Sequence, residues 1–341
     1  MTYDAILLVS FGGPEKNEDV LPFLENVLRG RNVPRERMLE VAEHYYHFGG
    51  KSPINEQNRA LIAALKHELN VHGIDLPIYW GNRNWHPLLP DALAQMKSDG
   101  VKRALAFVTA SYSSYSSCRQ YRENIATAQT KVGDGAPEVD KIRAYFNHPG
   151  FVETMTDRLR AALEQLPPEL RGEAQVVYTA HSIPTVMANG CKYVEQLTAA
   201  SRLVSELLGR TGDPLVFQSR SGPPTQPWLE PDILDHLRAI HSQGAKAVVI
   251  VPIGFVSDHM EVIYDLDTQA RELCEELGLT MVRAGTAGTH PRFVQMIREL
   301  IEERMSGATE RPALGVLGPS HDVCPLDCCP APARPPMTPV R

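Results

Sequence analysis

Histidine and carboxylate side chains gather where an apolar, β-branched run leads into a helix, within Val248–Glu276. Imidazole and carboxylate groups bind divalent metal ions and can also accept protons near neutral pH. Helix capping alone explains Ser257 or Asp258, but it does not explain acids that continue two turns into the helix. The sequence therefore predicts a metal or proton-transfer site here, with these candidate side chains: Asp258, His259, Glu261, Asp265 and Asp267.

A second histidine, His181, follows another buried apolar run and precedes Ser-Ile-Pro184. Ligands of open parallel sheets bind at the carboxyl ends of the strands, and His181 and Glu261 both fall at that rim. The alternative is a histidine that only satisfies backbone groups in a turn. Its predicted proximity to Glu261 favours an imidazole–carboxylate pair that holds a divalent ion loosely and transfers protons.

The carboxylates on the helix recur at α-helical spacing. Glu261, Asp265, Thr268 and Glu272 share one face at i, i+4, i+7 and i+11, while apolar residues occupy the other faces. A solvated surface would also explain these acids. In a mostly buried helix, however, an acidic stripe is costly unless it lines a wet or metal-bearing channel.

Apolar runs alternate with helical stretches along the chain. This alternation predicts an α/β fold with two parallel sheets of about four strands each, flanked by helices. A break within residues 132–146 predicts a first domain over 1–145 and a second, metal-binding domain over 146–290. A helix at 291–305 is expected to brace the first domain. The expected strands are residues 5–11, 78–81, 104–109, 176–180, 215–218, 247–251 and 281–284, and the expected helices are 56–69, 88–97, 151–165, 191–208 and 231–241.

Composition narrows the range of functions. The 341 residues are 43% hydrophobic and 22% charged, which is typical of a globular protein, and the net charge of −7 argues against nucleic acid as the main partner. The sequence contains no run of about 18 apolar residues, so no transmembrane helix is predicted. The N-terminus lacks a basic region and a cleavage site, so we expect a cytoplasmic protein.

Cysteines are concentrated in a Gly/Pro/Cys-rich tail over residues 306–341, where a segment without a periodic apolar face should be disordered unless it is pinned. Cys324, Cys328 and Cys329 lack the paired Cys-x-x-Cys spacing of a zinc ribbon. With one distant thiol they could form a four-thiolate iron–sulfur site, which would pin the tail. The alternative is that they are incidental free cysteines.

A further group of aromatic and basic residues suggests a flat, partly apolar cleft with cationic edges, suited to an aromatic ligand with carboxylates. Phe11-Gly-Gly-Pro14 lacks the glycine pattern of a phosphate loop, so we reject a nucleotide site there. For any single aromatic residue, ordinary packing is an alternative. The group is Arg29, Arg31, His44, Tyr45, Tyr46, Phe48, Tyr112, Tyr115, Tyr121 and Trp228.

Several motifs in order resemble the ferrochelatases, enzymes that insert ferrous iron into a porphyrin, over about residues 3–305. The resemblance implies the class II chelatase fold, with two Rossmann-like domains and a porphyrin cleft between them. The motifs are Leu8-Val-Ser-Phe-Gly-Gly-Pro14, Gly49-Gly-Lys-Ser-Pro53, Thr179-Ala-His-Ser-Ile-Pro184, Phe217-Gln-Ser-Arg-Ser-Gly-Pro223, Trp228-Leu-Glu-Pro231 and Pro252-Ile-Gly-Phe-Val-Ser-Asp-His-Met-Glu-Val-Ile-Tyr-Asp265.

The same resemblance assigns residues. It makes His181 and Glu261 the site for the substrate Fe²⁺, with Asp265 extending an acidic line that delivers metal or removes protons. Gln269 stands where relatives carry the next acid, and Phe11 replaces a tyrosine, which excludes an axial phenolate at that position. The implied porphyrin contacts are Phe11, Arg29, Tyr45, Ser52, Tyr121 and Trp228.

Cys118 resembles the internal ligand of a [2Fe-2S] cluster in the actinobacterial branch, where C-terminal cysteines complete the site. Cys324, Cys328 and Cys329 would be the other ligands; because the last two are adjacent, either each binds a different iron or one is replaced by Cys191 or Cys274.

The usual substrate of that branch is coproporphyrin III. Protoporphyrin IX is the alternative substrate. Two other functions remain open: another chelatase of the same architecture, such as a cobalt or sirohydrochlorin chelatase, and a haem- or porphyrin-binding carrier or sensor without turnover. We expect a monomer that makes transient contact with neighbouring haem-pathway enzymes.

Overall fold

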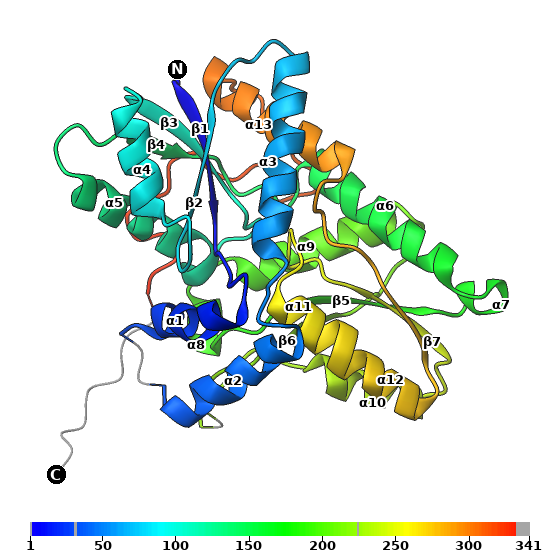
Figure 1. The fold of residues 1–341 in the computed structure, drawn as a ribbon. Coiled ribbons are helices and arrows are strands. Elements are labelled where there is room, and N and C mark those ends of the chain that lie inside the picture. The colour runs from blue at the N-terminus through cyan, green and yellow to red at the C-terminus, as the bar shows by residue number, and fades with distance from the viewer. Residues whose placement is uncertain (1, 31–32, 224, 332–341) are drawn as a thin grey trace.

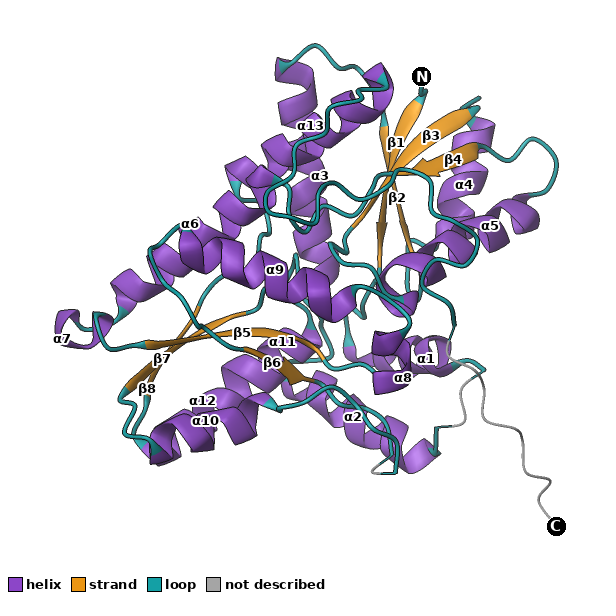
Figure 2. Ribbon diagram, turned by 180° about the vertical axis from the view of Figure 1, so that it is seen from behind, coloured by secondary structure: helices purple, strands orange, loops and turns teal. Residues whose placement is uncertain are grey.

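Two parallel four-stranded sheets form the framework of the computed structural model, which describes residues 2–30, 33–223 and 225–331 (Figures 1 and 2). Arg31 and residues 332–341 of the predicted tail lie outside these ranges. The seven predicted apolar runs all correspond to strands, which confirms the predicted fold class of two flanked parallel sheets. Within the described ranges, no helix combines the length and apolar character needed to cross a bilayer.

The first sheet has the order β2-β1-β3-β4. Its central strand is buried along its whole length, as expected for a strand with helices on both faces. On one face, α4 and α5 pack against β1 and β3 through Leu7, Leu93 and Ile125. The elements are β1 (Ala5–Ser10), β2 (Ile78–Asn82), β3 (Arg103–Val108), β4 (Glu138–Lys141), α3 (Ile54–Val71), α4 (Leu89–Ser98) and α5 (Gln120–Val132).

Strand β4 was missed by the sequence analysis. It lies inside the break predicted at residues 132–146, where the chain turns and then adds an edge strand to the first sheet. The sequence Glu138-Val-Asp-Lys141 has one apolar residue, because an edge strand covered on little of its surface needs no apolar run.

The second sheet has the order β6-β5-β7-β8. Helices α10 and α12 cover one face through Leu237 and Leu273, and α6 and α9 cover the other through Met155 and Leu197. That second face shares a continuous core with the first sheet, so α3, α6, α9 and α13 lie between the sheets (Figure 2). The elements are β5 (Gln175–His181), β6 (Leu215–Gln218), β7 (Ala247–Val251), β8 (Thr280–Arg283), α6 (Pro149–Gln165), α7 (Pro168–Arg171), α8 (Thr185–Asn189), α9 (Tyr193–Glu206), α10 (Ile233–Ser242) and α12 (Arg271–Leu277).

Helix α13 (Pro291–Ser306) packs against both α3 and α6 (Figure 1). The Arg298 guanidinium lies 2.8 Å from Glu68 of α3, and the Arg292 guanidinium lies 2.5 Å from Glu153 of α6. Helix α13 therefore contacts α6 as well as α3 of the first half of the chain.

Two helices that the sequence analysis did not predict, α1 (Asn17–Leu28) and α2 (Arg35–His47), pack on the start of helix α11 (Met260–Tyr264). Phe23 and Tyr45 meet Met260 in a separate apolar cluster. This contact brings the N-terminal part of the chain over the junction that carries Glu261.

The described part of the tail is held against the body of the protein. Asn147 exchanges backbone and side-chain hydrogen bonds with Leu314 and donates to the Gly318 carbonyl, and Arg143 donates to the Pro312 carbonyl. Asp322 pairs with Arg304 of α13. These contacts pin the segment that composition alone predicted to be disordered.

Candidate active site

The ends of β5 and β6 place the first side chains of the candidate site. His181 is the last residue of β5 and lies opposite Gln218, the last residue of β6. The turn after β7 approaches β5 so closely that a Cβ on Gly254 would lie 2.6 Å from the Ala180 Cβ. Only glycine fits there, and this close approach brings α11 up to His181.

His181 and Glu261 form the pair predicted from the sequence. The imidazole Nε2 lies 3.4 Å from Glu261 Oε1, and the two side chains are 29% and 47% exposed, so the pair is open to a ligand. His181 Nδ1 contacts the Ser182 carbonyl, which directs Nε2 toward Glu261. His259 is the N-cap of α11: its Nδ1 accepts a hydrogen bond from the Glu261 amide at 3.2 Å. The cap is thus neither Ser257 nor Asp258.

The electrostatics of the pair favour its ionised form. Burial opposes a charged imidazole, but the Glu261 carboxylate outweighs it and raises the pKa of His181 to about 9. Burial likewise opposes the charge on Glu261, yet His181 lowers the pKa of that carboxyl to about 2. Without a bound metal ion, the pair at neutral pH is an imidazolium next to a carboxylate.

Asp265 lies behind Glu261 and is held by hydroxyl and amide groups, without a cation. The Ser219 hydroxyl donates to Asp265 Oδ2, Gln218 Nε2 lies 3.4 Å from the same oxygen, and Gln218 also donates to the Glu261 carbonyl at 2.8 Å. Burial and the nearby Glu261 charge raise the pKa of Asp265 to about 7. Ser219 has a left-handed φ of 62°, a strained conformation of the kind found at functional sites.

The chain is π-helical from Asp265 to Ala270 (η2), which interrupts the α-helical spacing used to predict an acidic stripe. A π-helix places hydrogen bonds at i→i+5, so residues after Asp265 rotate relative to α11. The Thr268 hydroxyl accordingly lies 3.4 Å from the Ile263 carbonyl, and Gln269 and Glu272 are exposed. The apolar set predicted for the other faces is largely buried, including Val262, Leu266, Ala270 and Leu273.

The other two acids of the junction share one arginine, and Arg271 also lies 3.8 Å from Asp267. The Arg283 guanidinium binds Asp267 through two hydrogen bonds of 2.6 and 2.8 Å and also donates to Asp258 at 3.2 Å. The Asp258 amide is bound by Gln57 of α3. Asp258 and Asp267 therefore tie α11, β8 and α3 together and are not available to a metal ion.

Aromatic side chains from the N-terminal half pack against Met260, the residue before Glu261. Phe23 makes edge contacts with Phe11, Tyr45 and Trp85, with ring centroids 5.7–6.3 Å apart. Phe11 is 36% exposed, while burial near Glu261 raises the pKa of the Tyr45 phenol. Phe11 and Tyr45 of the predicted porphyrin contacts lie in this apolar wall, which Phe23 and Trp85 complete.

Arg83 is a cation that the sequence analysis missed. Its guanidinium lies 5.6 Å from the Phe11 ring centroid and 4.6 Å from that of Tyr121. It directly follows β2, so the rule that ligands gather at strand ends would have selected it if the second strand had been included. Gln218 and Ser219 likewise stand at the carboxyl end of a strand, β6.

The remaining predicted contacts differ in accessibility. Arg29 is exposed, whereas Ser52 and Tyr121 are buried, Ser52 with its amide bound to the Pro14 carbonyl. Trp228 forms a backbone bridge with Pro184, three residues after His181, and its indole nitrogen is buried without a hydrogen-bond partner in the described structure.

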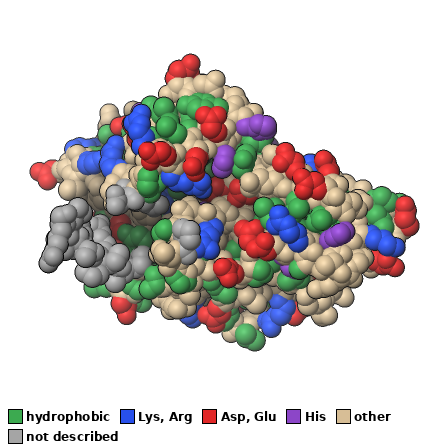
Figure 3. Space-filling model, turned by 90° about the horizontal axis from the view of Figure 1, so that it is seen from below, with side chains coloured by type: hydrophobic (Ala, Val, Ile, Leu, Met, Phe, Trp, Pro, Cys, Tyr) green, Lys and Arg blue, Asp and Glu red, His purple; other side chains and the backbone are tan. Residues whose placement is uncertain are grey.

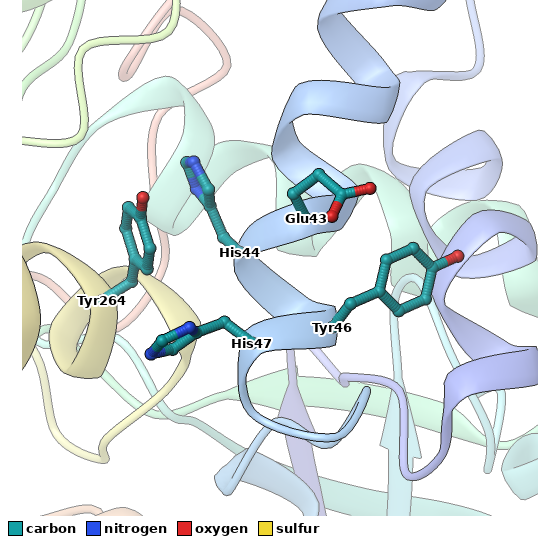
Figure 4. Close-up of a pocket in the computed structure, with 5 residues that line it drawn as sticks. All are labelled: Glu43, His44, Tyr46, His47 and Tyr264. Atoms are coloured by element: carbon teal, nitrogen blue, oxygen red, sulfur yellow. The ribbon is translucent and has the colours of Figure 1, made fainter.

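An open pocket of about 440 Å³ lies on the outer side of the α2–α11 contact. His44 and Tyr264 point toward each other there and stack with ring centroids 3.7 Å apart (Figure 4). Acidic and basic side chains are interspersed on the face shown in Figure 3 and do not form a single patch of one charge.

Comparison with known proteins identifies the family. The sequence profile of the ferrochelatases matches residues 3–305. The chain belongs to the ferrochelatase family. It is 59% identical over 337 residues to a ferrochelatase of Rhodopirellula baltica, covering 98% of this chain and 96% of that protein. It is 52% identical over 356 residues to the coproporphyrin III ferrochelatase of Streptomyces griseus, covering 98% and 95%.

The fold also matches solved chelatase structures. SirB from Bacillus subtilis with Fe³⁺ superposes with a TM-score of 0.55 at 12% identity, covering 89% of this chain and 98% of that one. At this identity the likeness concerns the fold alone, and it agrees with the predicted two-sheet chelatase architecture.

The cysteine tail lies beyond the residues matched by the ferrochelatase profile, and it meets Cys118 in the structure. Cys118 is buried in a π-helix, η1 (Tyr115–Arg119), and interaction with the Cys324 thiol lowers the pKa of Cys118. Cys328 Sγ lies 3.7 Å from Cys329 Sγ, and Cys329 has a left-handed φ of 52°.

The donor set fits an iron–sulfur cluster chemically. Four sulfur atoms in two close pairs, with one thiol already acidic, are the soft ligands that iron–sulfur clusters use. Cys191 instead donates to the Met187 carbonyl, and burial raises its pKa. Cys274 packs in the core of the second sheet, where burial raises its pKa to about 11. Neither is needed to complete four ligands.

Proposed function

We propose that this chain inserts Fe²⁺ into coproporphyrin III and releases two protons. The observation that carries the proposal is the His181–Glu261 pair: a 3.4 Å contact, open to solvent, next to an apolar aromatic wall. In the described structure Glu261 pairs with His181 and His259, and Asp265 is bound by Ser219 and Gln218, so an incoming metal ion competes with titratable and neutral groups for these carboxylates. The names of several relatives, such as the protein of Streptomyces griseus, support the choice of porphyrin.

The protonation states suggest a sequence of proton transfers. Fe²⁺ must displace the proton that Glu261 stabilises on His181, because a ligand imidazole has to be neutral. With a pKa of about 7, Asp265 can take up that proton and release it through the Ser219 side of the site. His181 and Glu261 then receive the two pyrrole protons as the metal ion leaves them for the macrocycle.

Substrate binding relies on the aromatic wall and the cations near it. Phe11 and its neighbours would contact the macrocycle, and binding energy from the propionates would support bending of the ring toward the metal site. Coproporphyrin III has four propionates and protoporphyrin IX has two. Arg29 and Arg83, together with Ser52, Tyr121 and Trp228, are the proposed polar edge.

The direct test compares iron insertion into the two porphyrins under anaerobic conditions. We expect a higher kcat/KM with coproporphyrin III. A preference for protoporphyrin IX would overturn the choice of substrate but keep the reaction class. Tight porphyrin binding without turnover of either compound would overturn the enzyme assignment and favour a carrier or sensor.

We further propose that Cys118, Cys324, Cys328 and Cys329 hold a [2Fe-2S] cluster. The close sulfur pairs and the carbonyl contacts from Arg119 and Arg122 to the backbone of Cys328 and Cys324 support this ligand set. When bound, such a cluster supplies one-electron redox chemistry and a covalent fastening of the tail. Absence of sulfur-to-iron bands from anaerobically purified protein would contradict it. The cytoplasmic location, the monomeric state, the domain bounds and contacts with neighbouring haem-pathway enzymes remain predictions.

A further inference from the structure

His321 lies beside the tail cysteines, in a position that the cysteine pattern alone did not reveal. Its imidazole nitrogen and the sulfur atoms of Cys324 and Cys328 all lie within 4.8 Å of one another. His321 Nε2 is 3.8 Å from Cys328 Sγ. The tail therefore offers a nitrogen donor in addition to its sulfur donors.

These donors form an outer and an inner group. His321 is exposed and Cys324 and Cys328 are partly exposed, whereas Cys118 and Cys329 are buried. An ion from solvent would meet the outer trio of His321, Cys324 and Cys328 first. The inner two sulfurs belong to residues that are more than nine-tenths buried.

The outer trio is held in place by contacts of the neighbouring residue Asp322 and by hydrogen bonds to backbone groups. Asp322, next to His321, pairs with Arg304 at 3.5 Å and with Arg311 at 3.3 Å, and Arg311 also donates to the Ser320 carbonyl. Arg122 donates to the Cys324 carbonyl, and the amide of Cys328 is bound by Pro325 in a turn. The three donors are thus positioned by contacts that do not depend on a metal ion.

The spacing suits a single tetrahedral ion. Metal–sulfur bonds of about 2.3 Å and metal–nitrogen bonds of about 2.0 Å place ligand atoms about 3.5 Å apart in a tetrahedral zinc site. The His321–Cys328 separation of 3.8 Å is close to this value, and the other two separations are no more than 4.8 Å, so binding would draw the donors together. Two thiolates and one imidazole select borderline-soft divalent ions of the zinc class over Mg²⁺ or Ca²⁺.

We propose that His321, Cys324 and Cys328 bind one exchangeable divalent ion of the zinc class, with a fourth position open to solvent. This occupancy excludes the four-cysteine cluster, because both use Cys324 and Cys328. The tail can then bind one of two ligands through Cys324 and Cys328: a single ion together with His321, or a cluster together with Cys118 and Cys329. The inference does not depend on iron insertion at His181.

Co²⁺ is the probe, added under anaerobic conditions to the full chain after removal of iron by a chelator. Thiolate-to-cobalt absorption reports only cysteine sites, so Co²⁺ at His181 and Glu261 does not contribute. We expect one equivalent of Co²⁺, displaced by Zn²⁺. His321→Ala should weaken this binding by at least about tenfold, because a ligand is lost. His241→Ala, which removes an exposed histidine of α10, should leave it unchanged.

Cys329→Ser separates this inference from the cluster proposal. It should preserve Co²⁺ binding but abolish the cluster formed on reconstitution with iron and sulfide, whereas His321→Ala should show the reverse. Equal Co²⁺ affinity in wild type and His321→Ala would overturn the inference, as would wild-type protein without thiolate-to-cobalt bands. Failure of wild type to form a cluster while it binds Co²⁺ through His321 would overturn only the cluster proposal.

Discussion

The four acids in and around α11 divide into two pairs with opposite surroundings. Asp258 and Asp267 share Arg283, while Glu261 and Asp265 face His181, Ser219 and Gln218. The first pair is bound by permanently charged arginines, whereas the ion-pair partners of Glu261 in the described structure are titratable histidines. Sequence neighbours therefore differ in what they can do: one pair fastens the helix, and the other can exchange protons and bind a metal ion.

The π-helical segment explains how one short stretch can serve both pairs. Asp265 and Asp267 are two residues apart, and the chain between them leaves the α-helical path. Asp265 contacts the end of β6, and Asp267 contacts Arg283 of β8. Four substitutions test the difference between the two pairs of acids, and their expected effects on iron insertion decrease from the first to the last.

His181→Ala should have the largest effect. It removes the imidazole from the titratable pair, and we expect iron insertion to fall by about 10³-fold or more, as for loss of a group that acts in both proton transfer and metal binding. Porphyrin binding, followed by fluorescence quenching, should stay within about threefold, since the aromatic wall is intact. His67→Ala, on the exposed face of α3, is the matched control. Normal turnover in His181→Ala would remove the distinction between the two pairs of acids.

Glu261→Gln should rank second and should act through the pKa of His181. The neutral amide no longer stabilises the imidazolium, so the pKa of His181 should fall from about 9 toward or below its ordinary value. Iron insertion should fall by about 10²-fold. A histidine NMR titration of wild type and variant measures the shift. An unchanged His181 titration would show that the pair seen in the structure does not persist in solution.

The sequence predicted this pair because the rule about strand ends is topological. His181 is the last residue of β5 and Glu261 comes after β7, and neighbouring parallel strands bring their carboxyl ends together whatever the details of packing. The two sheets followed from the apolar runs in the same way. Helices α1 and α2 were missed because they have no strand beside them to set the alternating pattern, and β4 because an edge strand is largely polar.

What the sequence could not separate were the two roles of the acids. Asp258, Glu261, Asp265 and Asp267 look alike in a spacing argument that assumes an α-helix, and the π-helical turn breaks that assumption. Arg283 stands in a strand, sixteen residues after Asp267, with no local signal that it binds two of them. Long-range pairing of this kind depends on how β8 lies beside β7, which no periodicity encodes.

Asp265→Asn should have a moderate effect that depends on pH. Because the pKa of Asp265 is raised to about 7, the carboxyl is mostly protonated below that pH and ionised above it. If its ionised form accepts the proton from His181, the activity of the wild type should rise as the pH increases through 7. The variant should lack this rising limb of the pH profile, and its rate at pH 8 should be about tenfold lower than that of the wild type. pH profiles of kcat/KM for iron measure both. Gln269→Ala, at an exposed position in the same π-helical segment, should keep the limb.

Asp267→Asn should have the smallest effect on iron insertion, within about twofold, yet it should lower stability more than Asp265→Asn does. The substitution breaks a bidentate contact with Arg283, whose side chain is mostly buried, and leaves that cation to Asp258 alone. A hydrogen-bonded charge left partly unpaired costs about 1–3 kcal/mol. Denaturant unfolding measures the loss for Asp265→Asn and Asp267→Asn in parallel. Asp265 resides in a site where burial disfavours its charge, so neutralising it should cost little or even stabilise the protein.

If Asp267→Asn instead abolished turnover with no loss of stability, Arg283 and its acids would belong to the reactive site. The division of the four acids into a fastening pair and a reactive pair would then be wrong.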